Sequence, residues 1–142
     1  MKLHQQCFNT PTNGRNTYNI TQKIEQIISE SGIKTGLCHV FIHHTSASLI
    51  ITENADPDVR YDLETVFSRL APDADPEYRH ILEGNDDMSA HIRSILTQTE
   101  LTLPVSDYHS GLGVWQGVFL WEHRTGYFQR KITVTVTGES GL

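Results

Sequence analysis

Apolar residues recur at helical spacing in three segments of the first hundred residues. Over residues 20–28 the isoleucines fall on one face of a helix that Gly32 is placed to end. A second helix is predicted to begin at Asp56-Pro57, because aspartate caps a helix and proline suits its first position. The third is predicted for residues 87–97. The apolar stripe of the second helix consists of Val59, Leu63, Val66, Phe67 and Leu70.

Runs of apolar residues and alternating positions predict strands elsewhere. Residues 36–45 are predicted to form a buried strand, on which successive side chains point to opposite faces, so that His43 and His44 diverge. Residues 46–53 form a second strand or continue the first. Further strands are predicted over residues 101–105, 114–123 and 132–137, the last with one wet face. Helices among the early strands and consecutive late strands indicate one α+β domain over residues 1–142, with a largely antiparallel sheet or sandwich and about three helices.

The composition indicates a globular protein and excludes several classes of partner. Of the 142 residues, 37% are hydrophobic and 20% are charged, and no apolar run is long enough to span a membrane. The N-terminus lacks the apolar core of a secretory signal, so we expect a cytoplasmic protein. A net charge of -6 with scattered Lys and Arg argues against nucleic-acid binding. Cys7 and Cys38 have the spacing of neither a zinc knuckle nor a disulfide framework.

The candidate chemistry lies between residues 43 and 91. His44 ends a strand face, and His91 lies on the apolar stripe of the third helix, four residues after Asp87. Asp87 can therefore hold one imidazole nitrogen and leave the other free for a metal. His80 lies in a segment without periodicity, and its direction cannot be predicted. The three histidines match no known metal spacing, and a core role for His44 or a helix-dipole role for Asp87 remains an alternative.

Residues 111–124 form an unusual strand segment because they contain three glycines. Glycine in a strand marks places where another group approaches the backbone closely, here another chain, a ligand or Trp115. Gln116 and Glu122 share one face of this strand and are candidate pocket-lining groups. Sheet packing around a tryptophan explains the segment equally well.

Four motifs in this order resemble the YjbQ family: His-Thr-Ser-Ala-Ser-Leu at 44–49, Glu-Asn-Ala-Asp-Pro at 53–57, Glu-Gly-Asn-Asp-Asp-Met-Ser-Ala-His-Ile at 83–92 and Gly-Val-Trp-Gln-Gly at 113–117. The resemblance covers nearly the whole chain. It implies a compact α+β fold built on a β-sandwich that typically assembles as a homotrimer. It also implies a weak thiamine-phosphate synthase activity, found in some members, which joins a pyrimidine diphosphate to a thiazole phosphate and releases pyrophosphate.

The resemblance also implies a site. The polar cluster of the family corresponds here to His44, Glu53, Asp56, His80, Glu83, Asp87, His91, Trp115 and Gln116. Metal or anion binding at the histidines is what the resemblance suggests. This chain departs from the family at Val114, where threonine is usual, and at Tyr108-His109, where a Gly-Arg pair is usual. Loss of that arginine removes a donor to phosphate.

Three functional hypotheses follow. The first is a small-molecule enzyme with synthase-type activity, whose substrates would include phosphorylated compounds. The second is a metal-dependent hydrolase in which His44, His80 and His91 hold zinc or magnesium. In that hypothesis Glu53 or Asp87 acts as the base, His44 is also a catalytic candidate, and substrate binding falls to Asp56, Glu83, Trp115 and Gln116. The third is a non-catalytic trimer that binds a metal or anion. The acidic balance and the lack of a glycine-rich phosphate loop favour the second hypothesis over the first.

Overall fold

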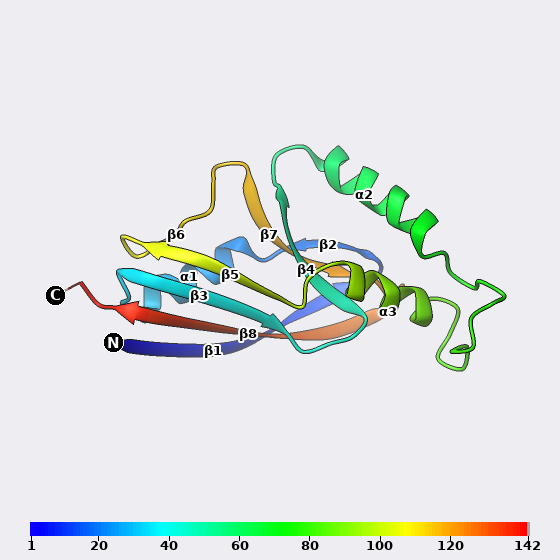
Figure 1. The fold of residues 1–142 in the computed structure, drawn as a ribbon, viewed down its shortest axis with the longest axis horizontal. Coiled ribbons are helices and arrows are strands. Elements are labelled where there is room, and N and C mark those ends of the chain that lie inside the picture. The colour runs from blue at the N-terminus through cyan, green and yellow to red at the C-terminus, as the bar shows by residue number, and fades with distance from the viewer. Residues whose placement is uncertain (142) are drawn as a thin grey trace.

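The computed structural model describes residues 1–141, which form two antiparallel sheets and three helices (Figure 1). The larger sheet contains, in spatial order, β1 (Lys2–Asn13), β8 (Tyr127–Glu139), β3 (Thr35–Ile42), β5 (Glu100–Ser106) and β6 (His109–Ser110). The smaller sheet contains β2 (Asn16–Asn19), β7 (Gln116–Glu122) and β4 (Ala47–Glu53). Each strand pairing in the described chain is antiparallel, so the predicted α+β fold is confirmed.

The hydrophobic core lies between the larger sheet, the smaller sheet and α1 (Thr21–Ser31). Alternate side chains of β3, β5 and β8 are buried, as the period-two pattern predicts. The isoleucines of α1 pack against them, and Gly32 ends the helix in the left-handed conformation at φ +67°. The sheet residues of this core are Cys38, Val40, Ile42, Ala47, Leu49, Leu101, Leu103, Val105, Val118, Leu120, Ile132, Val134 and Val136.

The N-terminal strands β1 and β2 are not among the predicted elements. β1 pairs with β8 along its whole length, from Lys2 opposite Gly138 to Asn13 opposite Tyr127. Its better covered face carries mostly polar side chains, so the alternation of apolar residues that would announce a strand is missing. The residues of that face are His4, Gln6, Phe8, Thr10 and Thr12.

The second helix, α2 (Pro57–Leu70), begins as predicted but packs differently from an ordinary amphipathic helix. Asp56 Oδ1 accepts a hydrogen bond of 2.9 Å from the Asp58 backbone N–H, and Pro57 occupies the first turn. No residue between Pro57 and Leu70 is buried, although an apolar stripe normally faces the core. The helix lies on the outer face of β7, where Phe67 meets Trp121 edge to face. Much of its stripe therefore remains at the surface.

The third helix, α3 (Asp87–Leu96), follows an irregular connection over residues 71–86. Internal hydrogen bonds fix this connection, among them one from the Tyr78 hydroxyl to the Pro72 carbonyl. Arg15 also holds Asp73 through two hydrogen bonds of 2.9 Å each. The end of the connection lies beside the turn between β7 and β8, because Asp86 accepts a 2.8 Å hydrogen bond from the Thr125 backbone N–H. Among the described residues, no helix has the length and apolar character needed to cross a membrane.

Candidate metal-binding site

Three of the predicted donors meet at the start of α3. Asp87 is the first residue of that helix and is only 5% exposed. Its Oδ2 atom lies 2.6 Å from His80 Nε2 and 3.0 Å from His91 Nε2. All three donor atoms lie within 4.8 Å of one another. Two imidazoles and a carboxylate form a donor set typical of divalent transition-metal sites.

His91 is oriented by the helix and by the connection between β3 and β4. It lies one turn after Asp87, so both side chains project from the same helical face, as the four-residue spacing predicts. Its Nδ1 atom lies 3.0 Å from the Thr45 carbonyl oxygen. Because a carbonyl oxygen only accepts hydrogen bonds, Nδ1 carries a hydrogen, and Thr45 rather than the predicted Asp87 holds this side of the ring. Nε2 faces Asp87 and is the nitrogen left for a metal, which would replace the hydrogen that Nε2 shares with that carboxylate.

His80 reaches the site from the irregular connection. Its ring centroid lies 5.3 Å from that of His91, and its side chain is 44% exposed. Its hydrogen bond to Asp87 is therefore made at the solvent side of the cluster. The site is open on the side of His80 and closed on the side of Asp87.

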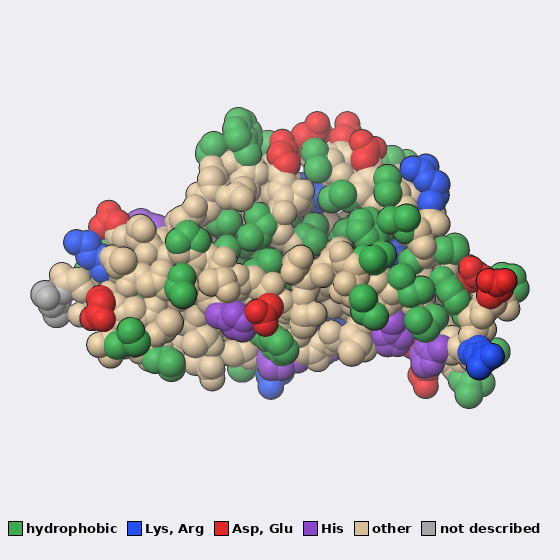
Figure 2. All heavy atoms as spheres, in the orientation of Figure 1, with side chains coloured by type: hydrophobic (Ala, Val, Ile, Leu, Met, Phe, Trp, Pro, Cys, Tyr) green, Lys and Arg blue, Asp and Glu red, His purple; other side chains and the backbone are tan. Residues whose placement is uncertain are grey.

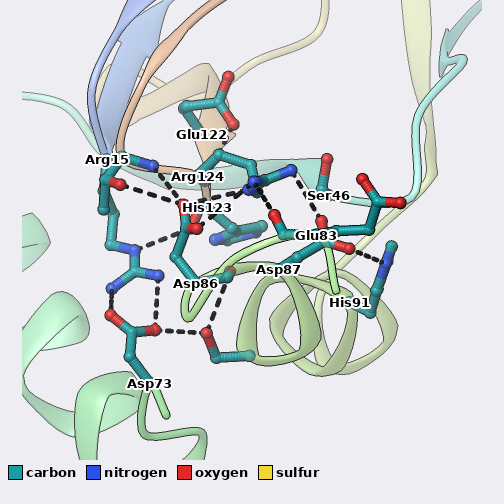
Figure 3. A network of polar contacts seen from close by, with 12 residues as sticks. Arg15, Ser46, Asp73, Glu83, Asp86, Asp87, His91, Glu122, His123 and Arg124 are labelled. Atoms are coloured by element: carbon teal, nitrogen blue, oxygen red, sulfur yellow. Dashed lines mark hydrogen bonds and ion pairs between the residues drawn. The ribbon is translucent and has the colours of Figure 1, made fainter. Parts of the chain in front are cut away.

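Arg124, in the turn after β7, holds the other side of Asp87 (Figure 3). Its Nη1 donates a 2.8 Å hydrogen bond to Asp87 Oδ1, while its Nε donates to Asp86 Oδ2 at 3.0 Å. Burial alone would raise the pKa of Asp87, but the hydrogen bond from His80 and the charges of His91 and Arg124 outweigh it and lower that pKa. Asp86 is shifted in the same way: against burial, Arg124 and Thr125 lower its pKa to about 2. Both carboxylates are ionised at neutral pH.

The structure does not bring His44 into this cluster, contrary to the predicted trio of histidines. Its Nε2 atom accepts a 2.8 Å hydrogen bond from the Lys131 backbone N–H, so that lone pair is already used. Burial, together with the charge of Arg130, lowers the pKa of His44. β3 ends at Ile42, before the two adjacent histidines. Strand alternation therefore does not set their directions, although His43 does turn elsewhere, to Thr133.

Four further predicted site residues lie together at the opposite end of β4, whose seven residues span roughly 20 Å. Glu53 Oε2 accepts hydrogen bonds from the backbone N–H groups of residues 55 and 56, at 2.9 and 2.8 Å. Asp56 caps α2, and Gln116 Oε1 accepts from the N–H three residues earlier at 2.7 Å. Trp115 is 63% exposed. Glu53, Asp56 and Gln116 thus have local roles in turns and a cap, and none of the four reaches the histidines.

Glu122, predicted to line a pocket, is fully buried and paired with Arg130 instead. Its Oε1 accepts from Arg130 Nε at 2.7 Å and from the Thr12 hydroxyl at 2.6 Å, and its Oε2 lies 2.5 Å from Arg130 Nη2. The close approach predicted for the glycines of this segment comes from the chain itself. A Cβ at Gly117 would lie 3.0 Å from the ring of Phe119.

The residue that sequence reasoning missed at the site is Arg124. Its partners Asp86 and Asp87 lie 38 and 37 positions earlier in the chain, so no local spacing connects them. In the sequence, Arg124 stands in a Glu-His-Arg segment that is typical of the end of a strand. Only the pairing of β7 within the smaller sheet brings this turn to the start of α3 (Figure 1).

The antiparallel sandwich and its polar cluster define the class of protein, and comparisons with known proteins agree. Residues 6–139 match the family described as UPF0047 protein YjbQ-like. A UPF0047 protein of Synechocystis sp. is 53% identical over 97% of this chain and 94% of its own length. UPF0047 protein YjbQ of Escherichia coli is 39% identical over 96% of this chain and 99% of its own. The chain belongs to the YjbQ (UPF0047) family, as its motifs predict.

Solved structures of similar chains show the same fold. A conserved hypothetical protein from Thermus thermophilus is 38% identical with a TM-score of 0.83, covering 93% of this chain and 99% of that one. An uncharacterised YjbQ/UPF0047 protein from Clostridium acetobutylicum is 31% identical with a TM-score of 0.82, covering 94% and 99%. The function of the family is not established, so a function for this chain is argued from its site.

Proposed function

We propose that this protein binds one divalent transition-metal ion through His80, Asp87 and His91 and acts as a metal-dependent hydrolase. The observation that carries the proposal is the convergence of two Nε2 atoms and one carboxylate oxygen within 4.8 Å. The atoms of His91 and Asp87 that would not face the ion already have partners, the Thr45 carbonyl and Arg124. Ligands held in this way keep their orientation when the ion arrives.

The donor set favours zinc or ferrous iron over magnesium. Imidazole nitrogen suits zinc and iron, whereas magnesium prefers carboxylate oxygen, phosphate and water. With two imidazoles and one carboxylate, magnesium would lack its usual ligands. Of the two ions suggested by the sequence, zinc is therefore the better candidate.

The chain's own groups support hydrolysis. When bound, such an ion supplies Lewis acidity that polarises a substrate carbonyl or phosphoryl oxygen. The partial exposure of His80 leaves the cluster accessible to a small substrate. Glu83 is exposed, and its carbonyl oxygen accepts a 2.9 Å hydrogen bond from Arg124, which also holds Asp87. We assign Glu83, rather than the distant Glu53, the role of proton acceptor from water.

Synthase-type transfer, which the family resemblance implies, ranks below hydrolysis for this site. Release of pyrophosphate is helped by cationic groups that are free to clamp the leaving group. Among the described residues near the cluster, Arg124 is engaged by Asp86 and Asp87, and Arg15 by Asp73, which leaves the exposed Arg79, next to His80 in the chain, as the remaining arginine for this role. Failure of a highly expressed copy to complement a thiamine auxotroph would agree with this ranking, and complementation by the wild type but not by His80→Ala would reverse it.

Metal analysis of the full-length protein tests the proposal. The protein is purified without added metal, stripped with a chelator and titrated calorimetrically with Zn²⁺, Fe²⁺ under anaerobic conditions, and Mg²⁺. We expect one Zn²⁺ per chain, at least 100-fold weaker binding in His80→Ala and His91→Ala, and wild-type affinity in His44→Ala. Absence of stoichiometric Zn²⁺ or Fe²⁺ binding by the wild type would refute the metal site.

A second measurement separates a hydrolase from a passive binder. Loaded and stripped proteins are assayed on a panel of p-nitrophenyl esters and phosphoesters, with Glu83→Gln and Glu77→Gln as matched variants on the same connection. We expect turnover that requires metal and Glu83 but not Glu77. Tight metal binding with no turnover of any ester would favour the non-catalytic alternative.

We further propose that copies of the chain associate, with the homotrimer typical of the resembled family as the expected assembly. Figure 2 shows hydrophobic side chains gathered over the surface between α2 and α3. Leu70 is 61% exposed and Ile95 is 81% exposed, although large apolar patches on monomers are uncommon. The other large apolar side chains exposed on these and neighbouring segments are Tyr61, Val66, Ile81, Leu82, Leu96, Val114 and Trp115.

Light scattering coupled to size exclusion tests the assembly. We expect three times the chain mass for the wild type and for Leu3→Glu, which alters an exposed leucine of β1. Ile95→Glu should shift the protein to monomer, because a charge cannot be buried unpaired in an apolar interface. A monomeric wild type would remove the proposal.

A further inference from the structure

We propose that Arg124 is a positioning residue of the metal site, which aims one oxygen of Asp87 at the two imidazoles. The inference rests on the proposed metal binding at His80, Asp87 and His91. A carboxylate can present either of its oxygens to a ligand. Here Arg124 takes Oδ1 at 2.8 Å, and Oδ2 alone lies against both histidines, at 2.6 and 3.0 Å.

The guanidinium can do this because three other hydrogen bonds fix it, two to Asp86 and one to Glu83 (Figure 3). Nε donates to Asp86 Oδ2 at 3.0 Å, and Nη2 donates to the Glu83 carbonyl at 2.9 Å. Asp86 is in turn held by the Thr125 backbone N–H at 2.8 Å. A planar fork with donors in fixed directions holds several acceptors at once, which an ammonium group cannot do.

This arrangement joins three separate elements of the chain. Arg124 lies in the turn after β7, Glu83 and Asp86 belong to the irregular connection, and Asp87 begins α3. The hydrogen bond to Asp87 holds the His80 side chain in the site. The relative positions of all three proposed ligands therefore depend on the arginine that links the turn, the connection and the helix.

The charge of Arg124 and its positioning role predict opposite effects of its removal on metal affinity, so a titration can separate them. As a cation next to a divalent ion, Arg124 repels it, so if charge were its only effect, removal would tighten metal binding. As the residue that orients Asp87, it contributes preorganisation, so removal would weaken binding. Partners of metal ligands that act in this way change affinity by about 10- to 100-fold.

Zn²⁺ titration of chelator-stripped, full-length Arg124→Gln and Arg124→Lys tests the inference. Positioning predicts a loss of about 10- to 100-fold in both variants, because neither side chain reproduces the fork. Asp86→Asn should show a smaller loss, since it weakens the anchor of Arg124 without touching a ligand. Arg60→Gln is the matched control, because Arg60 also donates to a backbone carbonyl, that of Glu53, but lies away from the site; its affinity should stay within about twofold. Tighter binding in Arg124→Gln with unchanged binding in Arg124→Lys would overturn positioning, as would wild-type affinity in both.

A second readout needs no metal and detects misfolding. In the metal-free protein, long-range ¹H–¹⁵N spectra resolve the imidazole hydrogen bonds of His80 and His91 to Asp87. We expect these signals to broaden or shift in both Arg124 variants while the amide spectrum of the sandwich is retained. Unchanged imidazole signals would overturn the inference even if Zn²⁺ bound. Changed signals in a protein whose wild type binds no Zn²⁺ would support it and refute only the metal.

Discussion

Two arginine–carboxylate pairs lie at the turn after β7, and they differ in whether a carboxylate oxygen is left for other groups. Glu122 and Arg130 are buried, and both oxygens of Glu122 are used by Arg130, Thr12 and the Arg124 backbone N–H. Asp87 gives one oxygen to Arg124 and turns the other to two imidazoles at the edge of solvent. An arginine–carboxylate pair is structural where both carboxylate oxygens have fixed partners, as in Glu122. It forms a candidate site where one oxygen faces groups that can bind a metal instead, as in Asp87.

The closed pair holds the two sheets together. Thr12 belongs to β1, Glu122 to β7 and Arg130 to β8, and Arg130 also donates to the Ser46 hydroxyl at 3.0 Å, just before β4. Four segments from both sheets therefore meet at one buried carboxylate. The Asp87 cluster lies on one helix, one connection and one turn, so a change there leaves the sandwich core untouched.

Breaking the closed pair should have the largest effect. Arg130→Met leaves the Glu122 carboxylate buried without its cation, which we expect to lower the free energy of unfolding by about 3–5 kcal/mol. Urea denaturation measures it, with the exposed Arg69→Met on α2 as control. The fraction that remains folded should bind Zn²⁺ as tightly as the wild type. A loss of unfolding free energy under about 1 kcal/mol would mean that the Glu122–Arg130 pair does not hold the two sheets together.

Much of the fold was predictable because its signals are local. The alternation over residues 132–137 identified β8, and Asp56-Pro57 identified the start of α2. The burial of α2 was not predictable in the same way, since an apolar stripe does not say which molecule covers it. β1 escaped notice because its register with β8, rather than an apolar face, makes it a strand.

The site divides along the same line. Asp87 and His91 were paired in advance because four residues make one helical turn. His80 had no predictable direction, and its place depends on the fixed irregular connection. His44 was grouped with them on the assumption of a continued strand, but the strand ends at Ile42 and the ring binds the Lys131 backbone. Arg124 required the tertiary fold.

Removing the charge of Asp87, the carboxylate that has one oxygen at the edge of solvent, should affect metal binding more than stability. Asp87→Asn deletes the anionic ligand but keeps the shape of the side chain, and Arg124 retains Asp86 as a partner. We expect Zn²⁺ affinity to fall at least 100-fold, about 2.7 kcal/mol of binding free energy, with a smaller loss of unfolding free energy than Arg130→Met causes. Asp62→Asn, an exposed acid on α2, is the charge-matched control. Equal Zn²⁺ affinity in both variants would show that Asp87 is not a metal ligand.

His123 provides the last and smallest test, because it is a closed histidine to set against the open His80 and His91. It is fully buried, its Nε2 lies 2.8 Å from the Ser48 hydroxyl, and burial together with the charge of Arg93 lowers its pKa to about 3. In the unfolded chain the ring titrates near 6.5. Below that pH the unfolded state takes up a proton that the folded state does not bind until about pH 3. Stability from this group is therefore complete above pH 6.5 and is lost on acidification, by ~1.4 kcal/mol per pH unit.

Urea denaturation at pH 7, 6 and 5 measures that slope, and other groups cancel in the difference between variants. His123→Gln removes the titrating ring while its amide can still hydrogen-bond to Ser48, so its free energy of unfolding should fall less steeply with acidification than that of the wild type. His39→Gln changes a partly exposed histidine of β3 and should keep the wild-type slope. If His123→Gln also keeps the wild-type slope, protonation of the buried ring does not cause the loss of stability in acid. The contrast between closed and open histidines would then have to rest on metal binding alone.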